Sequence, residues 1–166
     1  MAGNQLPYFA REALRTMLTN DLPALLDTID TAVGDGIVSH DLTHIYTAPM
    51  VKYDTLPVAL IMTLNTQYPD LERSDDIRAH MINIQLWDQS IEKVGTMLPA
   101  EVVAERVERM ATAVNNLIEA NCTLLVSGTH NSDYCSVEEI QYSDFQPRGA
   151  VMVRGALVQL MARYSL

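Results

Sequence analysis

The sequence predicts an α+β fold, in which one mixed or mostly antiparallel sheet of about four to five strands packs against helices. Apolar residues follow helical spacing at the start of the chain and again near its middle. Aliphatic runs of strand length occur in two groups, one before and one after the middle helix. Since 166 residues suit one domain, we expect residues 1–166 to form a single domain with a sizeable core.

Residues 1–34 are expected to hold two leading helices. Apolar side chains recur at the spacing of one helical face from residue 7 to residue 19. Asn20 and Asp21 are candidate caps for a second helix, and Gly34 lies where that helix should end.

Residues 37–57 carry prolines and no clean period, so they predict an extended arm or long loop with a short strand near Ile45. A connection of this length usually has a task, such as reaching a neighbouring subunit. A strand pair is expected within 58–98, with strands at 58–67 and 77–89. Apolar residues change faces along the second strand, which indicates a β-bulge or a change in how the strand is covered.

Residues 99–120 show the clearest helical pattern, with Pro99 at the start and charged residues on the opposite face. Glu105 and Arg109 are spaced as an i,i+4 ion pair on that face. A loop at 121–136 follows, with a short strand at about 123–126. The segment 137–166 predicts an antiparallel closing hairpin.

The last strand of this hairpin is apolar on both faces, so a helix or a neighbouring subunit must cover the second face. We expect that second face to be a subunit interface, with nearby arginines pairing with acidic side chains of a neighbour. The apolar interface candidates are Val151, Val153, Leu157 and Met161, and the basic candidates are Arg148, Arg154 and Arg163.

The net charge of −10 disfavours tight wrapping of nucleic acid and adhesion to an anionic membrane. A channel lined by acidic subunits would still let a DNA duplex slide through without sticking. The N-terminal residues do not resemble a secretory signal, and no apolar run has the length of a membrane span. We therefore expect a soluble protein made in a cytoplasm.

Candidate chemistry is sparse in this sequence. His40, Asp41 and His44 form an H-D-x-x-H pattern, which could bind a metal ion if the segment were helical. A small metal-dependent hydrolase or binding module is therefore the alternative function. The neighbouring glycine and β-branched residues instead favour a loop or strand, in which these side chains would be too far apart.

Three weaker patterns have structural explanations. An acidic cluster between the two predicted strands lacks EF-hand spacing and is typical of a solvated turn; its members are Asp70, Glu72, Asp75 and Asp76. A Cys/His pair drawn from His80, His130 and Cys135 is conceivable but has no supporting motif. Cys122 and Cys135 lack zinc spacing, so we expect two reduced thiols, with a disulfide across the loop as the alternative.

The order of these elements resembles the tail terminator or tail-completion proteins of tailed bacteriophages and related minor tail and neck subunits. The resemblance covers nearly the whole chain. It is carried by the leading helices REALRTMLTNDLPALLDTID, the exit DGIVSHDL, the strand LPVALIMTL before YPDLE, the long strand HMINIQLWDQ, the helix AEVVAERVERMATAVNNLIEAN and the final hairpin.

The resemblance implies a non-enzymatic, cofactor-free virion protein that forms a ring, commonly a hexamer, at the head-proximal end of the tail. Such a ring caps the last tail-tube ring, stops polymerisation and offers a docking face to the head connector or neck. Its partners would be copies of itself, the tail tube protein and the connector, with DNA only passing through, and assembly would take place in the host cytoplasm. The two leading helices and the loop at 121–136 depart from the simplest terminators, which leaves a neck adaptor or minor capsid-associated role open.

Overall fold

The structure, a computed structural model, describes residues 6–48, 55–67 and 77–165. These residues form three helices, one six-stranded sheet and a small separate hairpin. The helices are α1 (Pro7–Asn20), α2 (Leu22–Val33) and α3 (Pro99–Ala120). The strands of the large sheet are β1 (His44–Tyr46), β2 (Val58–Gln67), β3 (Ile77–Ser90), β6 (Tyr134–Tyr142), β7 (Gln146–Arg148) and β8 (Val151–Ser165), and the small hairpin is β4 (Leu125–Val126) with β5 (Thr129–His130).

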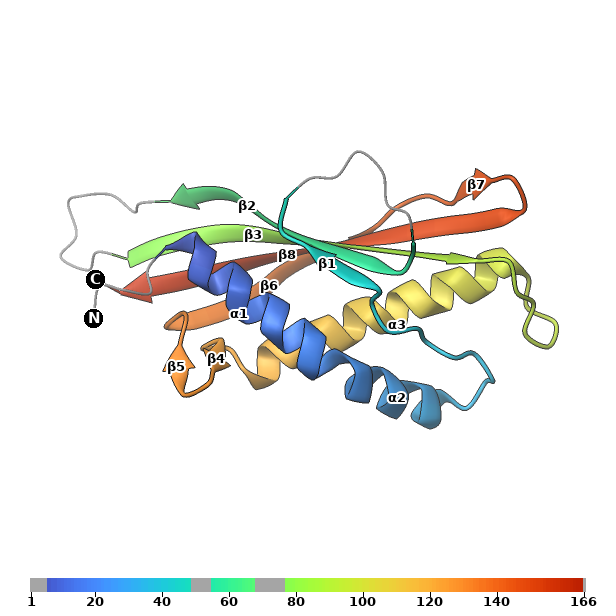
Figure 1. Ribbon diagram of the computed structural model, residues 1–166, viewed down its shortest axis with the longest axis horizontal. Coiled ribbons are helices and arrows are strands. Elements are labelled where there is room, and N and C mark those ends of the chain that lie inside the picture. The colour runs from blue at the N-terminus through green and yellow to red at the C-terminus, as the bar shows by residue number, and fades with distance from the viewer. Residues whose placement is uncertain (1–5, 49–54, 68–76, 166) are drawn as a thin grey trace.

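The large sheet has the order β1-β2-β3-β8-β6, with β7 also paired to β8. β1 runs parallel to β2, and every other pairing in the sheet is antiparallel. The helices lie along one face of this sheet, and α2 packs against α3 (Figure 1). The predicted α+β class is confirmed, as are the two leading helices, the strand pair and the closing hairpin.

The core lies between the helices and the inner face of the sheet, and its side chains are almost entirely aliphatic. Every second residue of each strand points to this face. These side chains pack against the apolar stripes of α1 and α3. The sheet contributes Ala59, Ile61, Ile82, Ile84, Leu86, Val158, Leu160 and Ala162, and the helices contribute Leu14, Met17, Val103, Val107, Met110 and Val114. Full burial of each large side chain stabilises the fold by roughly 1.5–3 kcal/mol.

Of the two helix-end signals predicted for α2, the structure confirms the one at its C-terminus. Gly34 adopts the left-handed conformation (φ 64°) that ends α2, and its N–H donates to the Asp30 carbonyl, as expected from the glycine. Asp21 precedes α2 but makes no capping hydrogen bond with its side chain, so the expected cap is absent there.

Some details differ from the prediction. The bulge expected in the second long strand is not in β3, which pairs with β8 without a break. The register shifts instead in β2, between Thr63 and Asn65, and in β6, between Val137 and Glu139. The apolar residues of β3 change faces because Ile82, Ile84 and Leu86 face the helices. Nearer the start of the strand, Ala79 is buried and Met81 is half-buried on the opposite face.

The loop predicted at 121–136 is also more ordered than expected. It contains the β4–β5 hairpin, and β6 already begins at Tyr134. The short strand expected at 123–126 is confined to Leu125–Val126. Among the described residues, no helix combines the length and the apolar character that crossing a bilayer requires.

Candidate functional site

The described helices lie on one side of the sheet (Figure 1), and the face opposite them is here called the outer face. Leu157 and Met161 of β8 are half-buried there, opposite Gln85 and Met81 of β3. The strand register assigns the following residues to this face: Val58, Leu60 and Met62 of β2, Met81, Asn83, Gln85 and Trp87 of β3, and Val153, Leu157 and Met161 of β8.

The apolar interface candidates therefore share one face, but they are not equally accessible. Val151, Leu157 and Met161 are half-buried, whereas Val153 is only 1% exposed. Val153 already belongs to the interior of the chain, so it offers no surface to a partner. The interface itself stays a prediction, now centred on Leu157 and Met161.

Two of the three candidate arginines already have partners within the chain. Arg154 donates to Glu108 of α3 (3.1 Å) and lies over the rings of Tyr142 and Phe145. Arg163 is 3.7 Å from Glu138. The side chain of Arg148 is exposed and makes no hydrogen bond or ion pair with any described residue, so it is the cation best placed to meet a neighbour.

Trp87 packs directly on Gly155 of the neighbouring strand at the outer face. A Cβ atom at position 155 would lie 2.6 Å from Cε3 of the indole, closer than real carbon contacts allow. Glycine therefore lets the ring lie flat on the sheet. A cavity of about 230 Å³ adjoins this contact, between Gln85, Gln141 and Leu157.

The H-D-x-x-H segment does not form the helical face that a metal site would need. His40 and Asp41 lie outside helices and strands, and His44 begins β1. Within the described ranges, no three His, Cys, Asp or Glu side chains come together as a metal-binding group. No observation therefore favours the metal-dependent alternative.

The candidate Cys/His pair has no activated nucleophile. The ring nitrogen Nδ1 of His80 is 2.9 Å from the Thr66 hydroxyl, and that of His130 is 2.8 Å from the Thr123 hydroxyl. Burial raises the pKa of the Cys135 thiol to about 12, so the thiol stays protonated at neutral pH. Cys122 and Cys135 are both free thiols, and the acidic cluster at 70–76 lies outside the described residues.

Two arginines of α3 form a buried ionic network that the sequence pattern did not reveal. Arg109 was expected on the exposed face with Glu105, yet it is only 4% exposed and binds Asp30 (2.9 Å), Asp35 and the Ile37 carbonyl. Glu105 is 3.9 Å away, at the outer edge of the network. The sequence signal for this network was the pair of carboxylates, Asp30 and Asp35, on either side of Gly34, which ends α2.

The neighbouring Arg106 is 2% exposed and fixes the next part of the chain. Its Nε donates to the Val38 carbonyl, and its Nη2 donates to Glu92, both at 2.8 Å. Together the two guanidiniums hold the segment after α2 against α3. This segment leads into β1, so the network positions one edge of the sheet.

The pKa values of the carboxylates near this network are shifted in opposite directions. Burial alone would raise the pKa of Asp30, but hydrogen bonds from Ser39 and Arg109 outweigh it and lower the pKa. The hydrogen bond from Arg109 likewise lowers the pKa of Asp35. Burial raises the pKa of Asp88, whose Oδ2 has no hydrogen-bond partner.

Asp88→Asn is expected to remove a pH dependence from stability. Because the pKa of Asp88 is raised in the folded state, the stability it contributes is present at low pH and lost as pH rises through the folded-state pKa. Relative to the wild type, the variant should therefore gain stability as pH rises from below the ordinary aspartate pKa towards neutral pH, measured by urea denaturation. Asp27→Asn, an exposed change on α2, is the control. A constant difference between Asp88→Asn and the wild type across this range would contradict the assignment.

Comparison with known proteins adds no family to this description. No protein-family model matches the chain, and no curated protein sequence matches it. The functional proposal therefore depends on the sequence pattern and on the surfaces described above.

Proposed function

We propose that this chain is a structural subunit of a tailed-phage virion that associates with copies of itself into a closed ring. In this proposal it acts as a tail terminator or tail-completion subunit at the head-proximal end of the tail, where it joins the tail to the neck. The observation that carries the proposal is the outer face, where apolar side chains of the two central strands, β3 and β8, stay partly exposed. Exposed apolar surface of this kind typically marks a protein–protein contact.

The order of elements supports the same proposal, because the fold contains the helices, strands and hairpin on which the resemblance was based. A net charge of −10 per subunit is suited to a ring through which DNA passes without binding. The other proposed partners are the tail tube protein and the head connector or neck protein. The proposal includes no catalytic step and no cofactor.

The purified protein should therefore form a ring, most simply a hexamer. Native mass spectrometry would give the number of subunits, and negative-stain electron microscopy would show the ring. A protein that stays strictly monomeric and holds one divalent ion per chain would instead support the metal-dependent alternative.

Leu157→Asp is expected to impair this association while leaving a soluble, folded subunit. A carboxylate buried in an apolar contact without a partner is strongly unfavourable, so association should weaken by about tenfold or more. Sedimentation velocity measures the association, and circular dichroism checks the fold. Met161→Asp is the second test, and Ala24→Asp on the exposed side of α2 is the matched control. Loss of folding in both outer-face variants would place these residues in the intrachain core and refute the interface assignment.

A further inference from the structure

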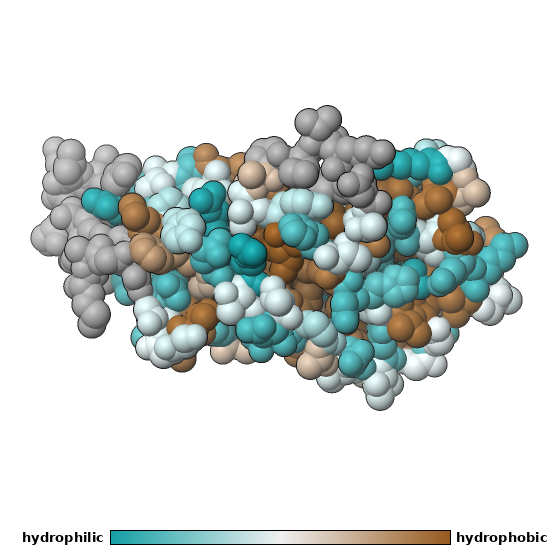
Figure 2. Space-filling view, in the orientation of Figure 1, coloured by the Kyte–Doolittle hydropathy of each residue, from teal (hydrophilic) through white to brown (hydrophobic). Residues whose placement is uncertain are grey.

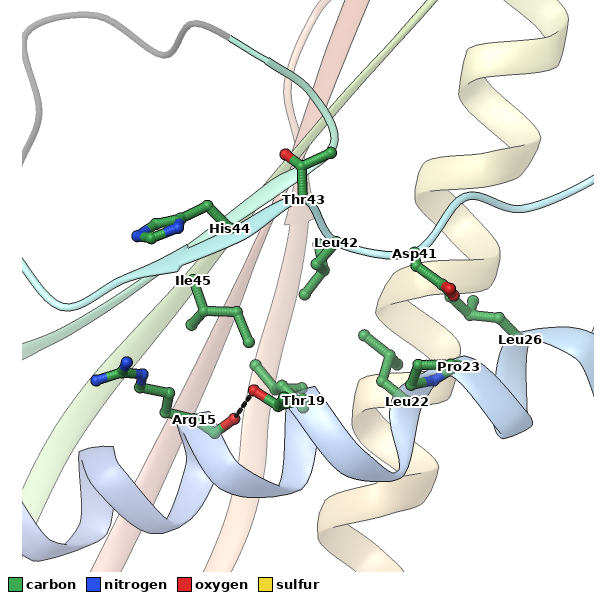
Figure 3. Close-up of a pocket in the computed structure, with 11 residues that line it drawn as sticks. Arg15, Thr19, Leu22, Pro23, Leu26, Asp41, Leu42, Thr43, His44 and Ile45 are labelled. Carbon is green, nitrogen blue, oxygen red and sulfur yellow. Dashed lines mark hydrogen bonds between the residues drawn. The ribbon is translucent and has the colours of Figure 1, made fainter.

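A groove of about 390 Å³ lies beside β1, between it and the helices α1 and α2. Figure 3 shows Leu22 and Ile45 converging on its apolar floor, and in Figure 2 an apolar recess occupies the middle of the displayed face. The polar side chains of the lining are exposed to solvent, among them Arg15, Asp41 and His44. Within this described lining, no buried polar group identifies a ligand. A pair of cysteines at the other end of the helix layer carries more specific chemistry.

Cys122 and Cys135 are neighbours in space. The backbone N–H of Cys135 donates to the Cys122 carbonyl (2.5 Å), and the N–H groups of Asn131 and Ser132 both donate to the Thr123 carbonyl (3.1 and 3.2 Å). In a β-sheet, a hydrogen-bonded pair of residues has its α-carbons about 5.5 Å apart. Disulfides usually join α-carbons about 4.4 to 6.8 Å apart, so the two cysteines have the backbone separation that a disulfide requires.

The Cys135 side chain points to the layer of the fold in which Cys122 lies. Cys135 is paired with Ala162 across β6 and β8, and both side chains belong to the core beneath the helices. Helix α3 lies on that side of the sheet, packs on β6 and β8, and ends at Ala120, shortly before Cys122. Both cysteines therefore lie where the end of α3 meets the start of β6.

The two thiols differ in their access to a reagent. Cys122 is half-buried, so a small oxidant in solution can reach its sulfur. Cys135 is buried, and its thiol stays protonated at neutral pH because burial raises its pKa. Cys122 is therefore the thiol that reacts first, and Cys135 is the one that can resolve the product.

We propose that Cys122 and Cys135 form an oxidation site, at which a small external disulfide such as oxidised glutathione converts the two thiols into one intrachain disulfide. Cys122 gives its proton to solvent, and its sulfur attacks the oxidant, which forms a mixed disulfide and releases one thiol. Cys135 then gives up its proton and attacks the Cys122 sulfur, which releases the second thiol. The chain loses two hydrogen atoms, and the oxidant is reduced to two thiols.

The crosslink would fasten an edge of the sheet to the helix layer. Among the described strands, β6 pairs only with β8, so its other side has no strand to hold it. A bond between Cys122 and Cys135 closes the loop that contains β4 and β5 and ties the start of β6 to the end of α3. A cytoplasm keeps such thiols reduced, whereas an oxidising medium closes the bond. The crosslink lies within one chain, so this inference does not depend on the proposed ring.

The test is treatment of the reduced, full-length protein with oxidised glutathione at neutral pH, followed by intact mass spectrometry. The chain should lose the mass of two hydrogen atoms and retain no glutathione. Cleavage before Asp133, which lies between the two cysteines, should then leave two peptides that separate only after reduction. The thermal unfolding midpoint should rise by several degrees on oxidation and fall again with reductant.

Two single variants separate the steps. Cys135→Ala lacks the resolving thiol, so it should keep one glutathione on Cys122. Cys122→Ser should stay unmodified while folded, because the thiol that remains is buried. Circular dichroism checks the fold of both variants, and the wild-type result decides without them. A wild-type chain that keeps glutathione on Cys122, that is linked only to a second chain, or that leaves both thiols unmodified overturns the inference.

Discussion

Replacing Arg109 with methionine is expected to lower the free energy of unfolding by about 3 kcal/mol, because a buried ionic network loses the cation that joins Asp30 and Asp35. Arg109 binds Asp30, Asp35 and the Ile37 carbonyl at once, and methionine fills part of the space without donating a hydrogen bond. Urea denaturation followed by circular dichroism measures the change. Arg15→Met is the matched control, since Arg15 is half exposed and its pair with Glu12 is weak.

The same variant should respond differently to acid. In the wild type, the lowered pKa values of Asp30 and Asp35 mean that their stabilising contribution is present above the ordinary aspartate pKa. That contribution is lost as pH falls through the folded-state pKa values. The Arg109→Met protein should therefore lose less stability on acidification than the wild type does. Equal unfolding midpoints for the variant and the wild type at pH 7 would show that the network contributes little.

Gly155→Val is expected to lower the free energy of unfolding by about 2 kcal/mol, because the new side chain overlaps the indole of Trp87. The first added carbon alone would approach the ring to 2.6 Å. Strand propensity predicts the opposite sign, since valine is favoured over glycine within strands. Thermal and urea unfolding of the single variant decide between packing and propensity.

A double-mutant cycle isolates the contact with Trp87. In a Trp87→Leu background the ring is gone, so Gly155→Val should be neutral or stabilising. The difference between the two backgrounds is the coupling energy of the pair. An equal loss in both backgrounds would assign the effect to the backbone at position 155 and not to the indole.

The local elements of this fold were predictable because their signals lie within short stretches of sequence. The aliphatic run at 58–67 and the apolar stripe of α3 each contain the periodicity that defines them. The order of strands could not be predicted in this way, because β8 lies between β3 and β6 as a result of pairings between distant segments.

The contrast between local signals and long-range contacts also explains which features of the candidate site could be predicted and which could not. The two apolar faces of β8 were visible in the sequence, but the burial of Val153 depends on its place in the assembled sheet. Arg106 and Arg109 resembled solvated charges because the partners that explain their burial are far away in sequence. Arg109 and Asp30, for example, are 79 positions apart. The groove beside β1 likewise combines residues from three separate elements.

The position of β8 at the centre of the sheet has a consequence for biosynthesis. β3 leaves the ribosome long before β8 does, since α3 and the strands β4 to β7 come between them in the chain. Until β8 emerges, the inner edges of β3 and β6 have no partner, and the long-range pairings of the sheet remain unmade. A nascent chain therefore lacks the part of the outer face that β8 supplies, which includes Leu157 and Met161. If subunits form the proposed ring, they could associate through this face only after β8 has joined the sheet.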